Sequence, residues 1–430
     1  MIKYRFMIII RDISWCFLFT IFMFQNAFNI RIDYFRYTDE IMTLFFGLYT
    51  IFYLFKKKII PKIYFKMYIV MAFLCAVGII SNIISGVSRS AFMIALDIMY
   101  LFKVFICFIG ASIYFKSIQK NKNLLRFIAF EVRIIVWIAF ICLIISQFIN
   151  IGMTRDIRFG IKCYAFVYSS AGMLSQYCIL FLIILTAELA IHRLDCKRWI
   201  SFIMLIVIWA STVRSRALVM ITVWLFICHI SRNINMFLAI YDNRIVKKIF
   251  RPQYTLTILS IIVLMGAGQL SKYFGNGIKS ARNLLVSGGL RIMNDFFPWG
   301  AGFGTFGTET AATYYSPLYY QYDLNSFWGL AENGSELTDC YWPAICGELG
   351  IIGLALMVIL VYLFIRQFYE QSKGCKFFII SSLTYIIYLL ISSVATGIFA
   401  SYVTAEFVII FAAVISNYTT NERSVVRWKV

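Results

Sequence analysis

Two arginines interrupt an otherwise uncharged apolar run in the middle of the chain. Arg214 and Arg216 lie within residues 200–230. A charge at the centre of a bilayer costs at least ~2.5–3.5 kcal/mol on insertion scales, and such residues usually mark a function. A planar guanidinium group forms paired hydrogen bonds with phosphate oxygens, so both side chains suit a lipid-linked phosphate. They could equally extend to ordinary lipid headgroups, and their spacing fits the two interpretations alike.

A second set of candidates lies in residues 272–342, where many aromatic residues are mixed with carboxylates. Aromatic rings can stack on the C–H faces of sugars while carboxylates accept hydrogen bonds from hydroxyls. Trp299 and Tyr341 are candidate sugar-binding rings, and Asp339 is the carboxylate nearest the end of the segment. Anchoring at the membrane interface would also place aromatic residues here. The density of rings favours a glycan for the segment as a whole.

Five further charged residues are expected to face the same side as this segment. Each could contact a glycan or a phosphate, or only lipid headgroups. They are Arg89, Arg155, Arg158, Arg282 and Glu406.

The composition excludes several other kinds of site. The 11 cysteines are scattered without a Cys-x-x-Cys pair, and both histidines, His192 and His229, are expected near the cytoplasmic face. A zinc site is therefore not indicated. The glycines of residues 298–307 lack the strand-to-helix context of a dinucleotide fold, and no Gly-Lys-[Ser/Thr] sequence indicates ATP or GTP. We expect no cofactor and no metal.

The elements that position these residues must be membrane helices. The chain of 430 residues is 61% hydrophobic and 14% charged, whereas about a quarter of residues in soluble domains are charged. Apolar runs long enough to cross a bilayer recur along the whole length, and they are too continuous for the strands of a barrel. The sequence therefore predicts an all-α polytopic membrane protein. About twelve spans are expected, at 13–30, 38–55, 67–85, 92–115, 127–149, 168–190, 199–213, 217–231, 254–271, 343–365, 377–396 and 401–418.

The basic residues set the orientation. The net charge of +20 comes from short clusters between the apolar runs, which is typical of cytoplasmic loops rather than of a nucleic-acid-binding surface. With both termini cytoplasmic, the cytoplasmic loops hold more than twice as many basic residues as the outward loops. A single helix over 199–231 would reverse this bias for every later loop. It would also be about 50 Å long, far more than the ~30 Å hydrocarbon core.

Three regions follow from these assignments. Residues 1–271 form about nine spans, including a short hairpin at 199–231 whose turn carries Arg214 and Arg216. Residues 272–342 form one large outward loop, periplasmic or extracellular, with the glycan-binding and catalytic candidates. Residues 343–430 form about three further spans. Because each arm of the hairpin is shorter than the hydrocarbon core, its turn should lie recessed below the outer surface.

Three stretches in this order resemble the superfamily of O-antigen ligases and Wzy-type polysaccharide polymerases. VRSRAL (213–218) is similar to its Ser-Arg motif, and GLRIMNDFFPWGAGFGTF (289–306) resembles its arginine followed by Pro-x-Gly-x-Gly-x-Gly. DCYWPAICGELGIIGL (339–354) is similar to the segment that enters the next helix. The resemblance covers roughly residues 199–365.

The resemblance implies a membrane glycosyltransferase of the bacterial cytoplasmic membrane. Such enzymes act on the outer side on glycans linked to undecaprenyl pyrophosphate, transfer the glycan to an acceptor hydroxyl, and release the lipid pyrophosphate. A chain-length regulator and a flippase of the same pathway are the implied partners. The motif arginines match Arg216 and Arg291, which would neutralise the leaving pyrophosphate, with Arg214 as a neighbour that the motif does not require.

The position of the base distinguishes the branches of this superfamily. Ligases, which transfer the glycan to lipid A-core, carry a His-Asn pair nine residues before the motif glutamate. Asp339 and Cys340 stand there before Glu348, so a polymerase of lipopolysaccharide or capsule repeat units is favoured over a ligase. Asp339 either accepts the proton of the acceptor hydroxyl or orients the acceptor while the pyrophosphate takes the proton. Glu348 is expected to be structural, at the opening of a helix.

A lipid-linked oligosaccharide flippase or transporter is the alternative from another class. Transporters tend to have two related halves and charges at mid-membrane, and neither is apparent in the sequence.

Overall fold

The structure is a computed structural model, and it describes residues 2–29, 32–118, 122–192, 195–230, 280–373, 375–415 and 425–427. These residues are mostly helical. The helices and strands are α1 (Ile2–Met23), α2 (Gln25–Asn29), η1 (Asp33–Tyr37), α3 (Thr38–Lys57), β1 (Ile59–Pro61), α4 (Lys62–Ser85), α5 (Ala91–Ser117), α6 (Lys122–Phe148), β2 (Thr154–Arg158), β3 (Ile161–Tyr164), α7 (Ala171–Glu188), α8 (Cys196–Ser211), α9 (Ser215–Ile230), α13 (Ala281–Asp295), α14 (Glu309–Thr313), α15 (Pro317–Gln321), η2 (Leu324–Ser326), α16 (Tyr341–Ser372), α17 (Lys376–Ser393), η3 (Ile398–Ala400), α18 (Tyr402–Ile415) and β4 (Val425–Arg427).

Within the described residues, six helices are long and apolar enough to cross a membrane. They are α4, α5, α6, α7, α16 and α17, and each overlaps a span predicted from the sequence. The prediction of a helical membrane protein is confirmed at this level. The other predicted spans are helical where they are described (α1 to α3, α8, α9 and α18), and the predicted span 254–271 lies outside the described residues.

The apolar run around Arg214 and Arg216 forms two helices, as predicted. Helix α8 ends at Ser211 and α9 begins at Ser215, and Val213 between them has a left-handed φ of 50°. The two helices pack against each other. The break therefore puts Arg214 directly before α9 and Arg216 in its first turn.

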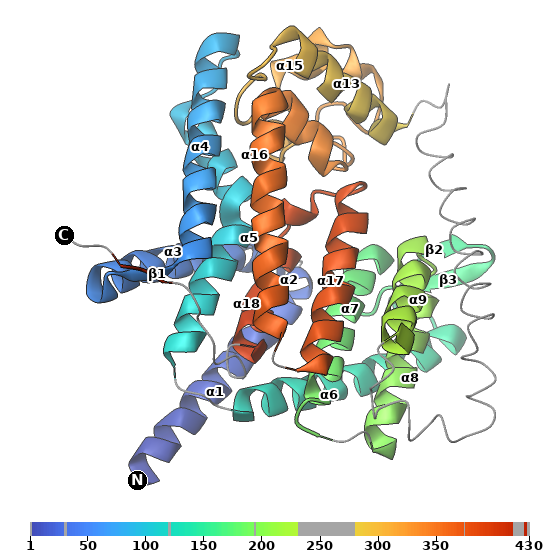
Figure 1. Ribbon diagram of the computed structural model, residues 1–430. Coiled ribbons are helices and arrows are strands. Elements are labelled where there is room, and N and C mark those ends of the chain that lie inside the picture. Colours follow the sequence, from blue (N-terminus) through green and yellow to red (C-terminus); the bar gives the residue numbers. More distant parts are fainter. Residues whose placement is uncertain are drawn as a thin grey trace.

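The helices share one apolar core. Helix α16 packs against α4 and α17, and α18 packs against α5, as Figure 1 shows for the helices that run side by side. Aromatic rings fill these contacts: the rings of Phe368 and Phe411 are stacked with centroids 3.7 Å apart. Close packing of such rings stabilises the bundle through many small dispersion contacts.

Residues 280–340 form a separate layer at the end of the bundle opposite the N-terminus, and we call it the cap (Figure 1). Its helices are α13 to α15, and it has its own apolar core, which includes Leu285, Phe306 and Leu324. The side chain of Ser280 begins α13 by accepting a hydrogen bond from the Asn283 amide, a capping contact that contributes about 1 kcal/mol. The predicted loop 272–342 begins outside the described residues.

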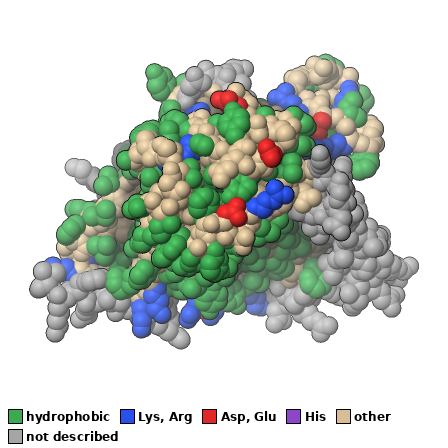
Figure 2. Space-filling model, turned by 90° about the horizontal axis from the view of Figure 1, so that it is seen from above, with side chains coloured by type: hydrophobic (Ala, Val, Ile, Leu, Met, Phe, Trp, Pro, Cys, Tyr) green, Lys and Arg blue, Asp and Glu red, His purple; other side chains and the backbone are tan. Residues whose placement is uncertain are grey.

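The cap fits tightly onto the bundle through glycines. A Cβ added at Gly78 of α4 would lie 2.2 Å from the ring of Phe303. A Cβ at Gly289 of α13 would lie 2.6 Å from the carbonyl oxygen of Pro343 in α16. Seen from the cap side, charged side chains of both signs are spread over the cap, while the flank below is mostly hydrophobic (Figure 2).

Candidate functional site

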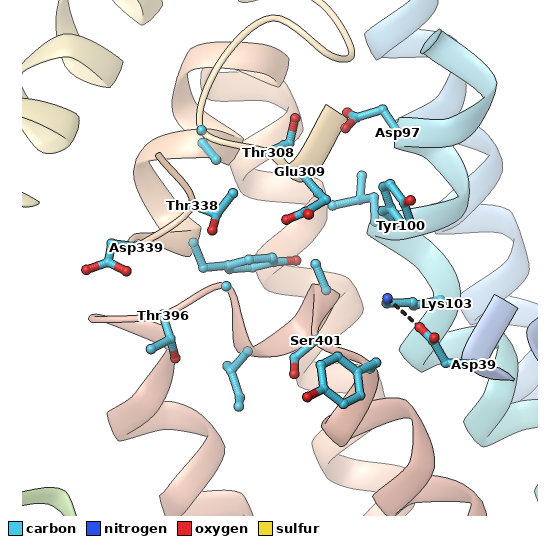
Figure 3. Close-up of a pocket in the computed structure, with 18 of the residues that line it drawn as sticks. Asp39, Asp97, Tyr100, Lys103, Thr308, Glu309, Thr338, Asp339, Thr396 and Ser401 are labelled. Atoms are coloured by element: carbon cyan, nitrogen blue, oxygen red, sulfur yellow. Dashed lines mark hydrogen bonds and ion pairs between the residues drawn. The ribbon is translucent and has the colours of Figure 1, made fainter. Parts of the chain in front are cut away.

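A cavity of about 520 Å³ lies between the cap and the helices beneath it. Its walls come from α2 and α3, from α5, from the cap segments 307–309 and 338–340, and from the ends of α7, α16 and α18. Polar side chains dominate the lining (Figure 3). The polar and charged lining residues are Gln25, Asn26, Asn29, Arg36, Asp39, Glu40, Asp97, Tyr100, Lys103, Gln176, Thr308, Glu309, Thr338, Asp339, Tyr341, Thr396, Ser401 and Tyr402.

Asp339 stands at one end of this cavity, with two arginines from different elements beside it. Arg282 of α13 donates a hydrogen bond from Nη2 to Asp339 Oδ2 at 3.1 Å. Burial raises the pKa of the Asp339 carboxyl, and the positive charges of Arg282 and Arg216 act against that rise. Asp339 and Arg282, both named from the sequence, are thus in contact, and the charge of Arg216 acts on the same carboxyl; neither arginine is among the residues that line the cavity.

The two arginines of the α8–α9 turn have different surroundings. Arg214 donates from Nη2 to both carboxylate oxygens of Asp156 in β2, at 3.3 Å each. Arg216 makes no ion pair with a described residue, and its Nη1 is buried without a hydrogen-bond partner there. Arg214 therefore has a carboxylate partner, which it shares with Arg158, whereas Arg216 keeps an unused donor.

Arg291 lies away from this cluster. It is exposed and does not line the cavity. Arg282 and Arg291 are nine positions apart on α13, and at about 100° per residue they point to opposite sides of the helix. Only one of them can face Asp339, and that one is Arg282.

The remaining candidates lie around the cap. Tyr341 is buried in the cavity wall, and its hydroxyl lies 3.3 Å from Met357 Sδ. Arg89 donates from Nη1 to the carbonyl of Tyr314 at 2.8 Å, which ties the start of α5 to the cap. Trp299 is partly buried outside the cavity lining.

The glycine-rich stretch of the cap is held by two buried carboxylates. Glu348 Oε1 accepts hydrogen bonds from the Thr305 amide (2.8 Å), the Phe306 amide (3.0 Å) and the Thr308 hydroxyl (3.0 Å). Asp97 Oδ2 accepts from the Gly304 amide at 3.0 Å. These hydrogen bonds fix the stretch that continues into the cavity wall at 307–309.

Glycines let that stretch approach α16. Gly300 and Gly350 have φ values of +85° and +60°, which favour glycine. A Cβ at Gly350 would lie 2.3 Å from the Pro298 carbonyl oxygen. Helix α16 kinks at this residue.

Two expectations from the sequence are wrong. Glu348 does not open its helix, because α16 begins at Tyr341 and has no acidic residue in its first turn; it is structural through its bonds to the cap instead. Glu406 does not face outward. It is 1% exposed within α18, and the Tyr177 hydroxyl donates to its Oε2 at 3.3 Å.

The other end of the cavity was not predicted from the sequence. Lys103 of α5 and Asp39 of α3 form an ion pair of 2.7 Å, with side chains 7% and 3% exposed. Gln25 and Glu40 lie beside Asp39. A lysine inside one apolar run and two carboxylates at the start of another were the available signal, because charges within membrane spans usually have a partner.

No group of three or more His, Cys, Asp or Glu side chains that could hold a metal ion occurs in the part of the chain that the structure describes. The chain matches no protein-family model, and no curated protein matches it.

Proposed function

We propose that the protein is a membrane glycosyltransferase that polymerises undecaprenyl-pyrophosphate-linked oligosaccharide repeat units. The observation that carries this proposal is the position of Asp339, which stands at the rim of the cavity with Arg282 bound to it and with the charge of Arg216 acting on its carboxyl. A carboxylate next to two guanidinium groups suits a reaction in which a proton is removed near a leaving pyrophosphate. Positive groups aimed at developing negative charge are commonly the largest contribution to such catalysis.

In the proposed reaction, the growing glycan leaves its lipid carrier and joins the incoming unit. The bond between the anomeric carbon and the pyrophosphate oxygen breaks, and a bond from that carbon to the acceptor hydroxyl oxygen forms. Asp339 accepts the hydroxyl proton. Arg216 and Arg282 stabilise the charge on the departing pyrophosphate.

The proposal includes a topology of about twelve spans, with both termini cytoplasmic and the cap on the outer side of the bacterial cytoplasmic membrane. Two features support it. The cap lies at the opposite end of the bundle from the N-terminus (Figure 1). Strand β4 near the C-terminus pairs with β1 after α3, and the basic residues place both of these segments in the cytoplasm.

The test is a polymerisation assay with matched arginine variants. Purified protein is mixed with lipid-linked repeat units, and the products are separated on a gel. Because only Arg282 contacts Asp339, Arg282→Ala should lower the rate by about 10²–10³-fold, as for loss of one charge-stabilising donor, and Arg291→Ala on the same helix should lower it far less. A larger loss with Arg291→Ala would show that the pyrophosphate binds elsewhere on the cap.

A further inference from the structure

The cavity contains buried oxygen atoms whose hydrogen-bonding capacity is unused. Among the described residues, the buried side-chain polar atoms of its lining that lack a partner are all oxygens: Gln25 Oε1, Glu40 Oε2, Asp97 Oδ1 and Gln176 Oε1. Buried polar groups are satisfied in most proteins, by protein, water or a ligand. The bound partner of this cavity should therefore be rich in hydrogen-bond donors.

Two donors beside Gln25 Oε1 and Glu40 Oε2 are committed elsewhere. Gln25 is 3% exposed, and its Nε2 donates to the Arg36 carbonyl and to Asp39 Oδ1 at 3.3 and 3.2 Å, which fixes the orientation of its amide. Lys103 is paired with Asp39. Neither side chain can turn to satisfy Gln25 Oε1 or Glu40 Oε2 without losing a bond that it already makes.

The charges of this end disfavour an anion. Asp39, Glu40 and Lys103 come together with one positive charge for two carboxyl groups. At the rim, Arg36 lies 4.0 Å from Glu309, so the positive charge of Arg36 is also balanced by a carboxylate. A carboxylate on a ligand would meet acceptor oxygens and like charge, and an N–H group would meet complementary ones.

The two ends of the cavity thus have opposite preferences. Asp339 lies at one end and the Asp39–Lys103 pair at the other (Figure 3). The unused donor of Arg216 is near Asp339, whereas the unused acceptors of Gln25 and Glu40 lie beside Asp39. A ligand with phosphate at one end and N–H donors at the other would satisfy both.

We propose that the end of the cavity formed by Gln25, Asp39 and Glu40 binds a sugar that carries a nitrogen donor, either a free amine or an acylamino group, and that it rejects uronic acids. This rests on the proposed function, and it names the class of sugar that the glycosyltransferase accepts. Glu40 is the specificity-determining residue, because its buried Oε2 has no hydrogen-bond partner among the described residues, while its carboxyl group also contacts Asp39.

The test measures binding without the reaction. Saturation-transfer NMR of the detergent-purified full chain is recorded with four methyl glycosides: glucoside, 2-amino-2-deoxyglucoside, 2-acetamido-2-deoxyglucoside and glucuronide. At least one of the two nitrogen sugars should bind ~10-fold or more tightly than the glucuronide, because hydrogen bonds to charged groups are about twice as strong as neutral ones. Whichever of the two nitrogen sugars binds more tightly shows whether the site prefers a free amine or an acylamino group.

Variants locate the effect. Glu40→Gln should reduce the preference for nitrogen sugars and relax the rejection of the glucuronide. Gln176→Leu removes another unpaired oxygen of the cavity lining and should also reduce the preference for nitrogen sugars. Glu370→Gln, an exposed change at the far end of α16, should alter nothing. Equal or tighter binding of the glucuronide, no binding of any glycoside, or an unchanged preference in both cavity variants would overturn the proposal.

Failure of this inference is distinguishable from failure of the proposed function. Selective binding of nitrogen sugars without polymer formation would refute the polymerase and leave the sugar site in place. A polymer made equally fast from acceptors that end in uronic acid would refute the sugar site and leave the polymerase in place.

Discussion

Replacing Glu348 by alanine tests how the cap is held on the bundle. One carboxylate oxygen accepts two backbone amides and one hydroxyl from residues 305–308, and the side chain is 1% exposed. Alanine leaves the amides of Thr305 and Phe306 buried without an acceptor. At ~1–3 kcal/mol for each unsatisfied group, the local opening free energy of this stretch should fall by ~2–6 kcal/mol.

Hydrogen exchange with mass spectrometry measures this loss directly in peptides that cover residues 300–310. A fall of ~2 kcal/mol corresponds to exchange that is roughly 30-fold faster. Glu348→Gln keeps an acceptor oxygen for these amides, so its effect should be smaller than that of alanine.

The matched control lies on the same helix. Glu370 pairs with Lys373 at 2.6 Å and is 44% exposed, so Glu370→Ala should change stability by only ~0–1 kcal/mol and leave exchange in the cap unchanged. If Glu348→Ala exchanged no faster than Glu370→Ala in residues 300–310, the hydrogen bonds from Glu348 would not hold the cap on α16 as proposed.

Three further changes test other parts of the structure. Gly350→Ala should prevent assembly of the cap, because its Cβ would lie 2.3 Å from the Pro298 carbonyl oxygen, whereas Gly86→Ala, with a similar φ of +64° and no atom within 4 Å, should be tolerated; comparable expression and thermal unfolding of both variants would contradict this. Lys103→Met should lower the free energy of unfolding by ~3–5 kcal/mol by leaving a buried carboxylate unpaired, and adding Asp39→Asn should restore most of it; thermal unfolding in micelles measures both. Arg282→Ala removes a charge that lowers the pKa of Asp339, so the carboxylate form should persist only at higher pH, and the acid limb of the transfer rate should move to higher pH; a limb that did not move would exclude Asp339 as the base.

The break at Arg214 and Arg216 was predictable because it follows from length and charge. A continuous helix would have been too long for the bilayer and would have reversed the positive-inside bias. The glycines at 300–307 were recognisable as a site of close backbone approach. What they approach, the kink of α16 at Gly350, depends on how two distant segments pack.

The pairings of charged residues were not predictable for the same reason. Asp39 and Lys103 come from separate helices, and no spacing rule connects residues on different helices. Glu348 was expected at a helix start, but α16 begins seven residues earlier, at Tyr341, which is about two turns. On α13, the sequence alone does not say whether Arg282 or Arg291 faces Asp339, since that depends on the rotation of the helix against α16.

The central claim, that this chain forms glycosidic bonds at Asp339, is tested most directly by stoichiometry in liposomes. Reconstituted protein is supplied with undecaprenyl-pyrophosphate-linked repeat units, and released lipid pyrophosphate is counted against new glycosidic bonds. We predict a ladder of polymers with equal numbers of both, and loss of both in Asp339→Asn. Movement of repeat units across the bilayer with no new bond, or bond formation that Asp339→Asn leaves unchanged, would contradict the account.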